Sequence, residues 1–132
     1  MCVDIHPYFD DLIVSGGVDG KAVVFNIKSG KIIESVEKHT KRISSIGFMP
    51  DESLLAFATC SADNTGSLFI LNNDKSDEPI TERYRIQNHT KTLTSLSFHP
   101  LREYALFGSL DGTWSYHNIL RVRLIFIHIF SL

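Results

Sequence analysis

The sequence predicts an all-β protein built from repeated units of four short strands. The segment KHTKRISSIGFMP (38–50) has a copy in NHTKTLTSLSFHP (88–100), with the same residue types in register along its length. Short runs rich in β-forming residues, at 12–14, 54–57 and 104–107, are bounded by turn residues. Each run is followed by an Asp-Gly or Asp-Asn pair and then by a second β-rich run. Such a repeat, at a spacing of about 40–50 residues, indicates one supersecondary unit that recurs along the chain.

The first unit shows the pattern in full. A buried strand is expected at 12–14, a hairpin turn at Asp19-Gly20, and a second strand at 22–27. A further turn at Ser29-Gly30 precedes an expected strand at 31–36. The pattern therefore predicts antiparallel hairpins, and its apolar residues do not recur at the spacing of a helix.

The second and third units repeat this order. In the second unit, a weaker turn signal at Asp63-Asn64 separates strands expected at 54–57 and 67–71. In the third, Asp111-Gly112 separates strands expected at 104–107 and 113–119. The polar stretch NNDKSDEP (72–79) lengthens the second unit, and we expect it to be a surface loop, where insertions cost little.

Composition bounds the class of protein. A chain of 132 residues with 43% hydrophobic content favours one domain or part of one. A net charge of −2 gives no support to a general phosphate-binding surface. Cys2 and Cys60 have no CxxC spacing, so the sequence predicts neither a zinc site nor a disulfide framework and favours a reducing compartment. No apolar segment follows Met1, and the apolar tail is too short to span a bilayer, so we expect neither a signal peptide nor a membrane partner.

The units resemble the WD40 repeat, in which a His opens the unit and an Asp occupies its middle turn. Lys38-His39 and Asn88-His89 keep that His without the usual preceding Gly, and Phe25-Asn26 stands at the Trp-Asp position of the pattern. The resemblance covers residues 3–119. It implies a β-propeller fragment of about three four-stranded blades, of an expected seven, at 1–37, 38–87 and 88–119.

A closer resemblance is to the pre-mRNA-processing factor 19 family. Segment 15–50 resembles that family's first blade running into its second, and Trp114, displaced toward the turn, resembles its third. In that family a U-box recruits a ubiquitin-charged E2, a coiled coil forms a tetramer, and the propeller recruits substrates and spliceosomal proteins in the nucleus. Neither the U-box nor the coiled coil is found in these 132 residues. The resemblance therefore implies a non-catalytic, cofactor-free protein-binding scaffold that meets RNA only indirectly. The alternatives are an unrelated WD40 adaptor, which would be cytoplasmic, and an RNA-binding propeller.

The second unit has the side-chain types of a hydrolase triad in His39, in Thr59 or Ser61, and in Asp63. A nucleophile would need an exposed elbow of the GxSxG type, which the sequence lacks. In WD40 blades the same residues make a buried hydrogen-bond network that ties the blade together. We therefore expect a structural network and no catalytic residue.

The third unit has equivalents of this network in His89, Ser109 and Asp111. Phe107 stands where the second unit has Thr59, so the sequence predicts that the network of the third unit is incomplete.

Two further patterns do not meet the requirements of a ligand site. The run SGGVDGK (15–21) lacks the first Gly and the final Ser or Thr of a phosphate-binding loop, so we expect a hairpin turn there. The histidines show no spacing typical of metal ligands, and no metal site is expected.

Four basic residues are expected to share one rim, because equivalent positions of adjacent blades lie side by side: Lys38, Lys41, Arg42 and Lys91. Such residues are usually solvated loop charges, and the other interpretation is a contact with a protein or RNA.

The tail 120–132 is apolar and lacks the turn and polar alternation expected of a fourth strand. We interpret it as sequence that is not native to the blade. The alternative is a genuine fourth strand of the third blade.

Overall fold

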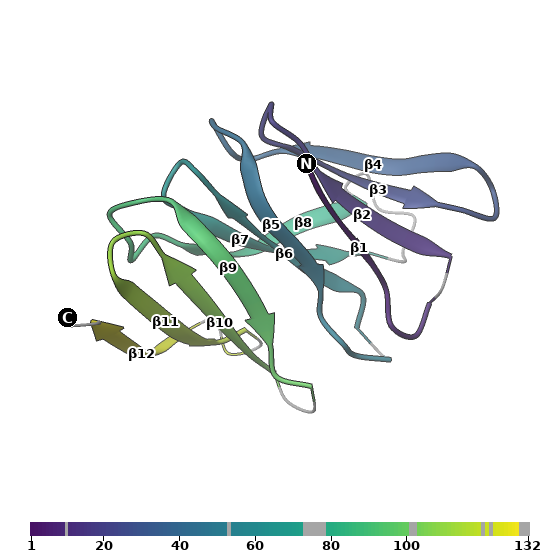
Figure 1. The fold of residues 1–132 in the computed structure, drawn as a ribbon. Coiled ribbons are helices and arrows are strands. Elements are labelled where there is room, and N and C mark those ends of the chain that lie inside the picture. The colour runs from purple at the N-terminus through teal and green to yellow at the C-terminus, as the bar shows by residue number, and fades with distance from the viewer. Residues whose placement is uncertain are drawn as a thin grey trace.

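The computed structural model describes residues 1–9, 11–52, 54–72, 79–100, 103–119, 121 and 123–129. Within these residues the chain is all-β and forms three four-stranded antiparallel sheets, as predicted (Figure 1). Each sheet is one blade, and its strands lie side by side in chain order. Blade 1 contains β1 (Cys2–Ile5), β2 (Leu12–Gly16), β3 (Lys21–Asn26) and β4 (Lys31–Glu37). Blade 2 contains β5 (Ile43–Phe48), β6 (Ala56–Ser61), β7 (Gly66–Leu71) and β8 (Ile80–Ile86). Blade 3 contains β9 (Leu93–Phe98), β10 (Tyr104–Ser109), β11 (Thr113–Asn118) and β12 (Arg123–Ile129).

The turn between the second and third strand of every blade contains one residue in the left-handed region. These residues are Gly20, Asn64 and Gly112, with φ of 84°, 74° and 82°. Glycine adopts this conformation without strain and asparagine tolerates it, which explains the Asp-Gly and Asp-Asn pairs. The preceding aspartate accepts a hydrogen bond from the backbone N–H two residues later, at 3.1 Å in blade 1 and 2.9 Å in blades 2 and 3. The sequence identified all three turns.

The blades stack face to face around the first strand of each sheet, with β5 in contact with both β1 and β9 (Figure 1). One apolar cluster lies between blades 1 and 2, where Val14 and Val24 meet the stacked rings of Phe57 and Phe69, 5.0 Å between centroids. A second cluster joins Leu68 of blade 2 to Phe107 of blade 3. Every residue of β6 is buried, because blade 2 has a neighbour on both faces.

The three blades have matching registers, so each residue has an equivalent in the next blade. Gly16 faces Ala22, Cys60 faces Gly66, and Gly108 faces Trp114 across the second and third strands. Trp114 is therefore equivalent to Ala22 and Gly66 and points to the opposite face from the usual WD40 tryptophan. That usual position belongs to Phe25, Phe69 and His117, which pair with Ile13, Phe57 and Ala105.

The segment 123–129 forms β12 and pairs with β11 from Thr113↔Ile129 to Asn118↔Arg123. It occupies the place of the fourth strand, as β4 and β8 do in the other blades. This arrangement corresponds to the alternative interpretation, a fourth strand of the third blade. The interpretation that residues 120–132 are not native to the blade concerns the gene and stays a prediction. Residues 120, 122 and 130–132 lie outside the described residues, as do 73–78 of the polar insertion, whose base is closed by Asn72 N–H donating to the Pro79 carbonyl at 2.8 Å.

Candidate functional site

The histidine before β5 organises a buried network in blade 2. Its Nδ1 lies 2.9 Å from Asp63 Oδ2, and its Nε2 lies 2.7 Å from Thr59 Oγ1. A carboxylate only accepts hydrogen bonds, so Nδ1 of His39 carries the proton and Nε2 accepts from the Thr59 hydroxyl. Asp63 also accepts from the backbone N–H of Thr40 at 3.1 Å. One side chain thus ties together the loop before β5, strand β6 and the β6–β7 turn.

Ser61 extends this network to the rim. Its hydroxyl lies 3.2 Å from the Lys41 carbonyl and 2.9 Å from the Arg42 carbonyl, and it accepts from Asp63 N–H at 3.1 Å. Burial alone would raise the pKa of Asp63, but the hydrogen bonds from Thr65 and His39 and the attraction of His39 hold it below its usual value. The carboxylate therefore stays ionised at neutral pH.

The same residues have the side-chain types of a hydrolase triad, but a substrate cannot reach their hydroxyl groups. Thr59 and Ser61 are both 0% exposed, and the Ser61 hydroxyl is already bonded to backbone carbonyls. A nucleophile must reach a substrate carbonyl, which neither hydroxyl can do from within the blade. The geometry serves stability and loop position.

Blade 3 has a complete network built from a different strand. His89 Nδ1 lies 3.2 Å from Asp111 Oδ2 and 2.8 Å from Thr113 Oγ1, and its Nε2 lies 2.8 Å from Ser115 Oγ. The prediction that Phe107 leaves this network incomplete is wrong, because Ser115 pairs with Phe107 across β10 and β11 and supplies the hydroxyl from the neighbouring strand. Ser109 binds the Lys91 and Thr92 carbonyls at 3.0 Å each, as Ser61 does in blade 2.

The network of blade 3 extends further than that of blade 2. Ser115 Oγ lies 2.8 Å from His117 Nε2, and His117 Nδ1 lies 3.0 Å from the Tyr84 hydroxyl of blade 2. A hydrogen-bonded chain thus runs from Asp111 to β8 of the neighbouring blade. Burial lowers the pKa of His117 to about 4, with repulsion from His89 adding to the effect. The hydrogen bonds that Asp111 accepts from Thr113 and Thr90 outweigh its burial and lower its pKa to about 2.

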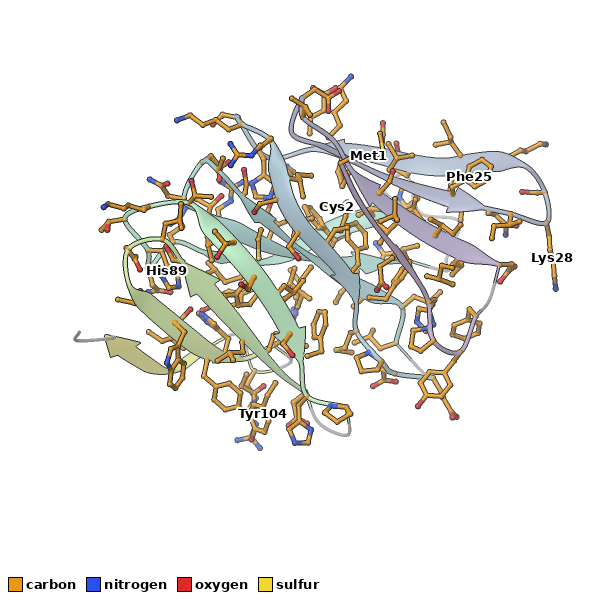
Figure 2. All side chains as sticks on the ribbon, in the orientation of Figure 1. Met1, Cys2, Phe25, Lys28, His89 and Tyr104 are labelled. Atoms are coloured by element: carbon orange, nitrogen blue, oxygen red, sulfur yellow. The ribbon has the colours of Figure 1, made fainter. Side chains whose placement is uncertain are left out.

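Ser115, His117 and Tyr84 are residues that the sequence did not reveal as network members. The available signal was His117 at the place of Phe25 and Phe69, a polar residue where the repeat has an aromatic one. Figure 2 shows His89 at one end of blade 3 and Tyr104 at the other; the network begins at His89 beside the β10–β11 turn and extends along β11 to His117, which pairs with Ala105 next to Tyr104.

The basic rim is formed by the loops that lead into β5 and β9 and consists of Lys38, Lys41, Arg42 and Lys91. All four residues are exposed. The Ser61 and Ser109 hydroxyls hold the Lys41 and Lys91 carbonyls in equivalent ways, so these two lysines occupy equivalent places on adjacent blades. The Lys38 carbonyl accepts from the Arg85 guanidinium. The backbone under the rim is therefore fixed, while its cationic side chains face solvent.

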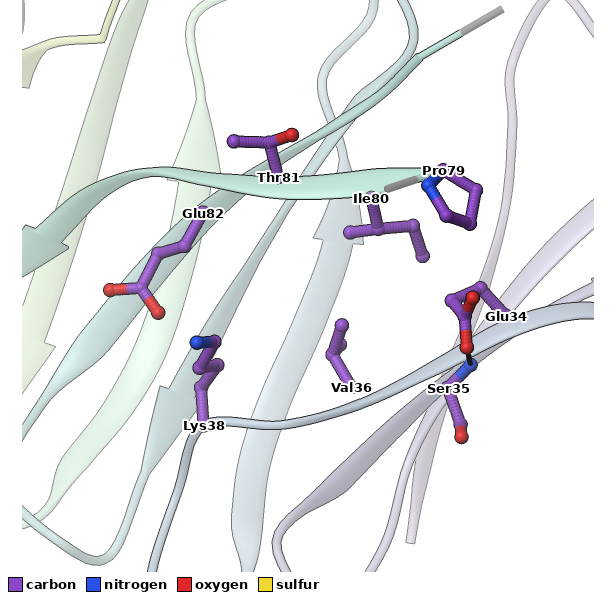
Figure 3. A pocket seen from close by; sticks show the side chains of 8 residues that line it. All are labelled: Glu34, Ser35, Val36, Lys38, Pro79, Ile80, Thr81 and Glu82. Carbon is purple, nitrogen blue, oxygen red and sulfur yellow. Dashed lines mark hydrogen bonds between the residues drawn. The ribbon is translucent and has the colours of Figure 1, made fainter. Parts of the chain in front are cut away.

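A groove between blades 1 and 2 begins beside this rim (Figure 3). It has a volume of about 410 Å³ and runs between β4 and β8, with Lys38 and Glu82 at one end and Glu34 and Pro79 at the other. Its lining mixes charged, hydroxyl and apolar side chains. Such a lining suits an extended polypeptide better than a buried small ligand.

The remaining sequence patterns have structural places. The SGGVDGK run is the β2–β3 hairpin, and Lys21 Nζ is 3.0 Å from Glu37 Oε1. Both cysteines are free thiols. Among the described residues, no group of His, Cys, Asp or Glu is arranged to hold a metal ion. No helix in the described part of the chain has the length and apolar character needed to cross a membrane.

Comparison with known proteins gives one matching family model, the WD domain, G-beta repeat (WD40), over residues 30–69 and 80–118. The chain is 32% identical over 109 residues to pre-mRNA-processing factor 19 homolog 2 of Arabidopsis thaliana, which covers 83% of this chain and 20% of the relative. It is 32% identical over 119 residues to pre-mRNA-processing factor 19 of Oryza sativa, covering 90% of this chain and 21% of the relative. It is also 28% identical over 114 residues to the human angio-associated migratory cell protein, covering 86% and 24%. The chain thus spans about a fifth of the length of the pre-mRNA-processing factor 19 relatives.

Proposed function

Because the chain belongs to the WD40-repeat family, we propose that it is a non-catalytic scaffold that binds proteins in pre-mRNA splicing. The family match and the similarity to pre-mRNA-processing factor 19 support this assignment. By the same resemblance, the partners are spliceosomal proteins or substrates of ubiquitination, and the location is the nucleus. The ubiquitin-ligase activity and the tetramer belong to the parent architecture of that family, in which this chain would supply recognition.

The basic rim is the surface that we propose for partner binding. The observation that carries it is the equivalent anchoring of the Lys41 and Lys91 carbonyls by the hydroxyls of Ser61 and Ser109. The backbone that carries these two lysines is held by side-chain hydrogen bonds, so the two loops lose little conformational freedom when a partner binds. Since the chain as a whole carries a net charge of −2, this local positive surface favours an acidic protein segment over a polyanion that needs an extended basic face.

Affinity purification from nuclear extract with quantitative mass spectrometry tests both parts of the proposal. The tagged wild-type chain is compared with a rim variant, K41E/K91E, and with a control, K28E/K31E, which makes the same charge change at exposed lysines in and next to the β3–β4 turn. Splicing proteins enriched with the wild type and the control, and lost with the rim variant, are the expected result.

Two outcomes would contradict it. Enrichment of proteins unrelated to splicing would indicate a WD40 adaptor of another pathway. Partners that disappear after RNase treatment, with a steep salt dependence that weakens in the rim variant, would indicate direct RNA binding.

A further inference from the structure

An apolar hollow lies on β4 next to the groove between blades 1 and 2. It has a volume of about 270 Å³, and most of its lining is apolar, with Phe9, Leu12 and Ile33 from blade 1 and Leu55 and Leu71 from blade 2. Leu12 and Leu71 belong to the buried cluster between the two blades, whereas Ile33 and Phe9 are 40% and 38% exposed. The base of the hollow is therefore part of the core, and its walls are open to solvent.

A β-bulge explains how the hollow and the groove come to share one strand. In the pairing of β3 with β4 the register shifts by one residue, which leaves Ile33 without an opposite residue. Neighbouring residues of a regular strand point to opposite faces, and a bulge re-aims one of them. Ile33 therefore lines the hollow while its neighbour Glu34 lines the groove, both beside blade 2. Pro79 lines both cavities, so the groove and the hollow form one track along β4.

The groove end of this track carries a cation without a counter-ion. No carboxylate of the described residues lies within ion-pair distance of Lys38 Nζ. Glu82, at the same end of the groove in Figure 3, is already bonded to Arg85 Nε at 3.1 Å. Glu34, at the other end, accepts from the Ser35 backbone N–H at 3.0 Å and has no ion pair within the same set of residues. The track therefore attracts an acidic residue at Lys38 and repels one at Glu34.

An extended polypeptide matches the backbone and the length of the track. β4 and β8 are the outer strands of their sheets, so each has a row of backbone N–H and C=O groups that no strand of the described sheets pairs. Extended segments bind such edges through their own backbone and are selected through their alternate side chains. Ile33 and Lys38 are five residues apart, a distance of about 15 Å in an extended chain, which a bound segment also spans in four or five residues.

We propose that this track binds an extended segment of a partner protein that combines an acidic and a large apolar side chain. The segment places an Asp or Glu beside Lys38 and, four or five residues away, a Leu, Ile, Met or Phe in the apolar hollow. Both walls of the track belong to blades 1 and 2, which pack on each other in this structure. The inference rests on the proposed function in one respect: the partner is a protein with an acidic segment, which continues from the basic rim into the track.

The probe is a phage-displayed library of random heptapeptides, selected on the immobilised 132-residue chain. Enriched peptides are expected to carry an acidic residue and a large apolar residue four or five positions apart. A fluorescein-labelled synthetic peptide of the enriched sequence is then titrated with the chain, and binding is followed by fluorescence anisotropy. Because the probe is synthetic, the result does not depend on whether the natural partners are splicing proteins.

Two variants with matched controls locate the bound peptide. Ile33→Lys places a charge in the apolar hollow and weakens binding by about tenfold or more. Ile32→Lys is its control, since it makes the same change at an adjacent residue that is 64% exposed and lies outside both cavities. Lys38→Glu weakens binding by about tenfold, and Lys31→Glu makes the same charge change at the exposed start of β4 and leaves binding unchanged.

A charge exchange identifies the contact at Lys38. A peptide with Lys in place of its acidic residue is expected to bind the Lys38→Glu variant better than the wild type, because the attraction is restored with the two charges reversed. Circular dichroism and urea unfolding show whether each variant is folded. Ile33→Ala removes the apolar contact without adding a charge and replaces Ile33→Lys if that variant does not fold.

Three outcomes would overturn the inference. Selection without a common sequence would show that the track binds no extended segment of this kind. Peptides lost with K41E/K91E but retained by Ile33→Lys would bind the rim alone, and the proposed partner surface would then stand without the track. Peptides weakened equally by Lys31→Glu would respond to overall charge. Conversely, peptide binding that requires Ile33 and Lys38, in a chain that captures no splicing proteins, would contradict the proposed function and support the inference.

Discussion

The buried histidine of blade 3 makes the stability of the protein depend on pH. His117 is 0% exposed, and burial lowers its pKa to about 4, with repulsion from His89 as the second cause. In the unfolded chain the pKa returns to about 6.5. Between these values the unfolded chain binds a proton that the folded protein does not. The free energy of unfolding is therefore highest above pH 6.5 and falls as the pH is lowered toward about 4.

The size of this effect follows from the two pKa values. Lowering the pH from about 7 to about 4.5 reduces the free energy of unfolding by about 2 kcal/mol through His117 alone. His117→Phe removes the titrating group and installs the residue type that Phe25 and Phe69 provide at the equivalent places of blades 1 and 2. The variant loses the hydrogen bonds to Ser115 and Tyr84, so we expect it to be less stable than the wild type at pH 7, by about 1–3 kcal/mol.

Urea unfolding followed by far-ultraviolet circular dichroism measures both quantities. Between the two pH values the wild type is expected to lose about 2 kcal/mol more than His117→Phe, because every other titrating group is common to both proteins. Tyr84→Phe is the control, since it removes one hydrogen bond and keeps the buried imidazole. Equal losses in the wild type and His117→Phe would refute the reasoning, because they would mean that the imidazole titrates normally in the folded protein.

Three further predictions concern single residues. Asp63→Ala removes the acceptor for the ring N–H of His39, which lowers the melting temperature and costs about 1–3 kcal/mol; an unchanged melting temperature together with a lost hydrolytic activity would instead support a triad. Gly16→Ala brings a Cβ to 2.6 Å from a side chain of blade 2 and destabilises the fold by about 1–3 kcal/mol in urea unfolding, whereas Gly47→Ala, with neighbours at 3.6 Å or more, changes it by less than about 0.5 kcal/mol. The thiol of Cys60, 0% exposed and with its pKa raised by burial, stays unmodified by iodoacetamide in the folded protein and reacts in urea, as intact-mass measurement would show; modification without urea would contradict its burial.

The sequence predicted the parts of this fold that depend on local geometry. Gly20 and Gly112 mark turns because positive φ restricts the choice of residue, and the structure places both at those turns. The copies at 38–50 and 88–100 predicted the repeat because every blade needs the same apolar row on its first strand. Local rules and repeat register were therefore sufficient for the number of blades and for the second and third strands of each.

The sequence did not predict contacts between residues of two different blades. His117 bonds Tyr84 across two blades, and nothing in either local sequence indicates that pair. β12 was also difficult to predict, because residues 120–132 lack turn chemistry and alternation, the two signals from which the other strands were identified. Its pairing with β11 comes from the hydrogen bonds of a sheet edge, which any extended segment can satisfy.

The departures of blade 3 from the repeat compensate one another. Blade 2 has a hydroxyl on its second strand, Thr59, and an aromatic ring on its third, Phe69, whereas blade 3 has the ring on its second strand and imidazole on its third, at Phe107 and His117. A ring at position 107 alone would remove the hydroxyl that donates to His89 Nε2, and a buried imidazole at 117 alone would leave its Nε2 without a partner. Ser115, adjacent to both, resolves the two conflicts by bonding both histidines. With the ring on the second strand of blade 3, Phe107 also packs against Gly66 of blade 2. The same arrangement therefore satisfies the packing between the blades and the hydrogen bonding within blade 3.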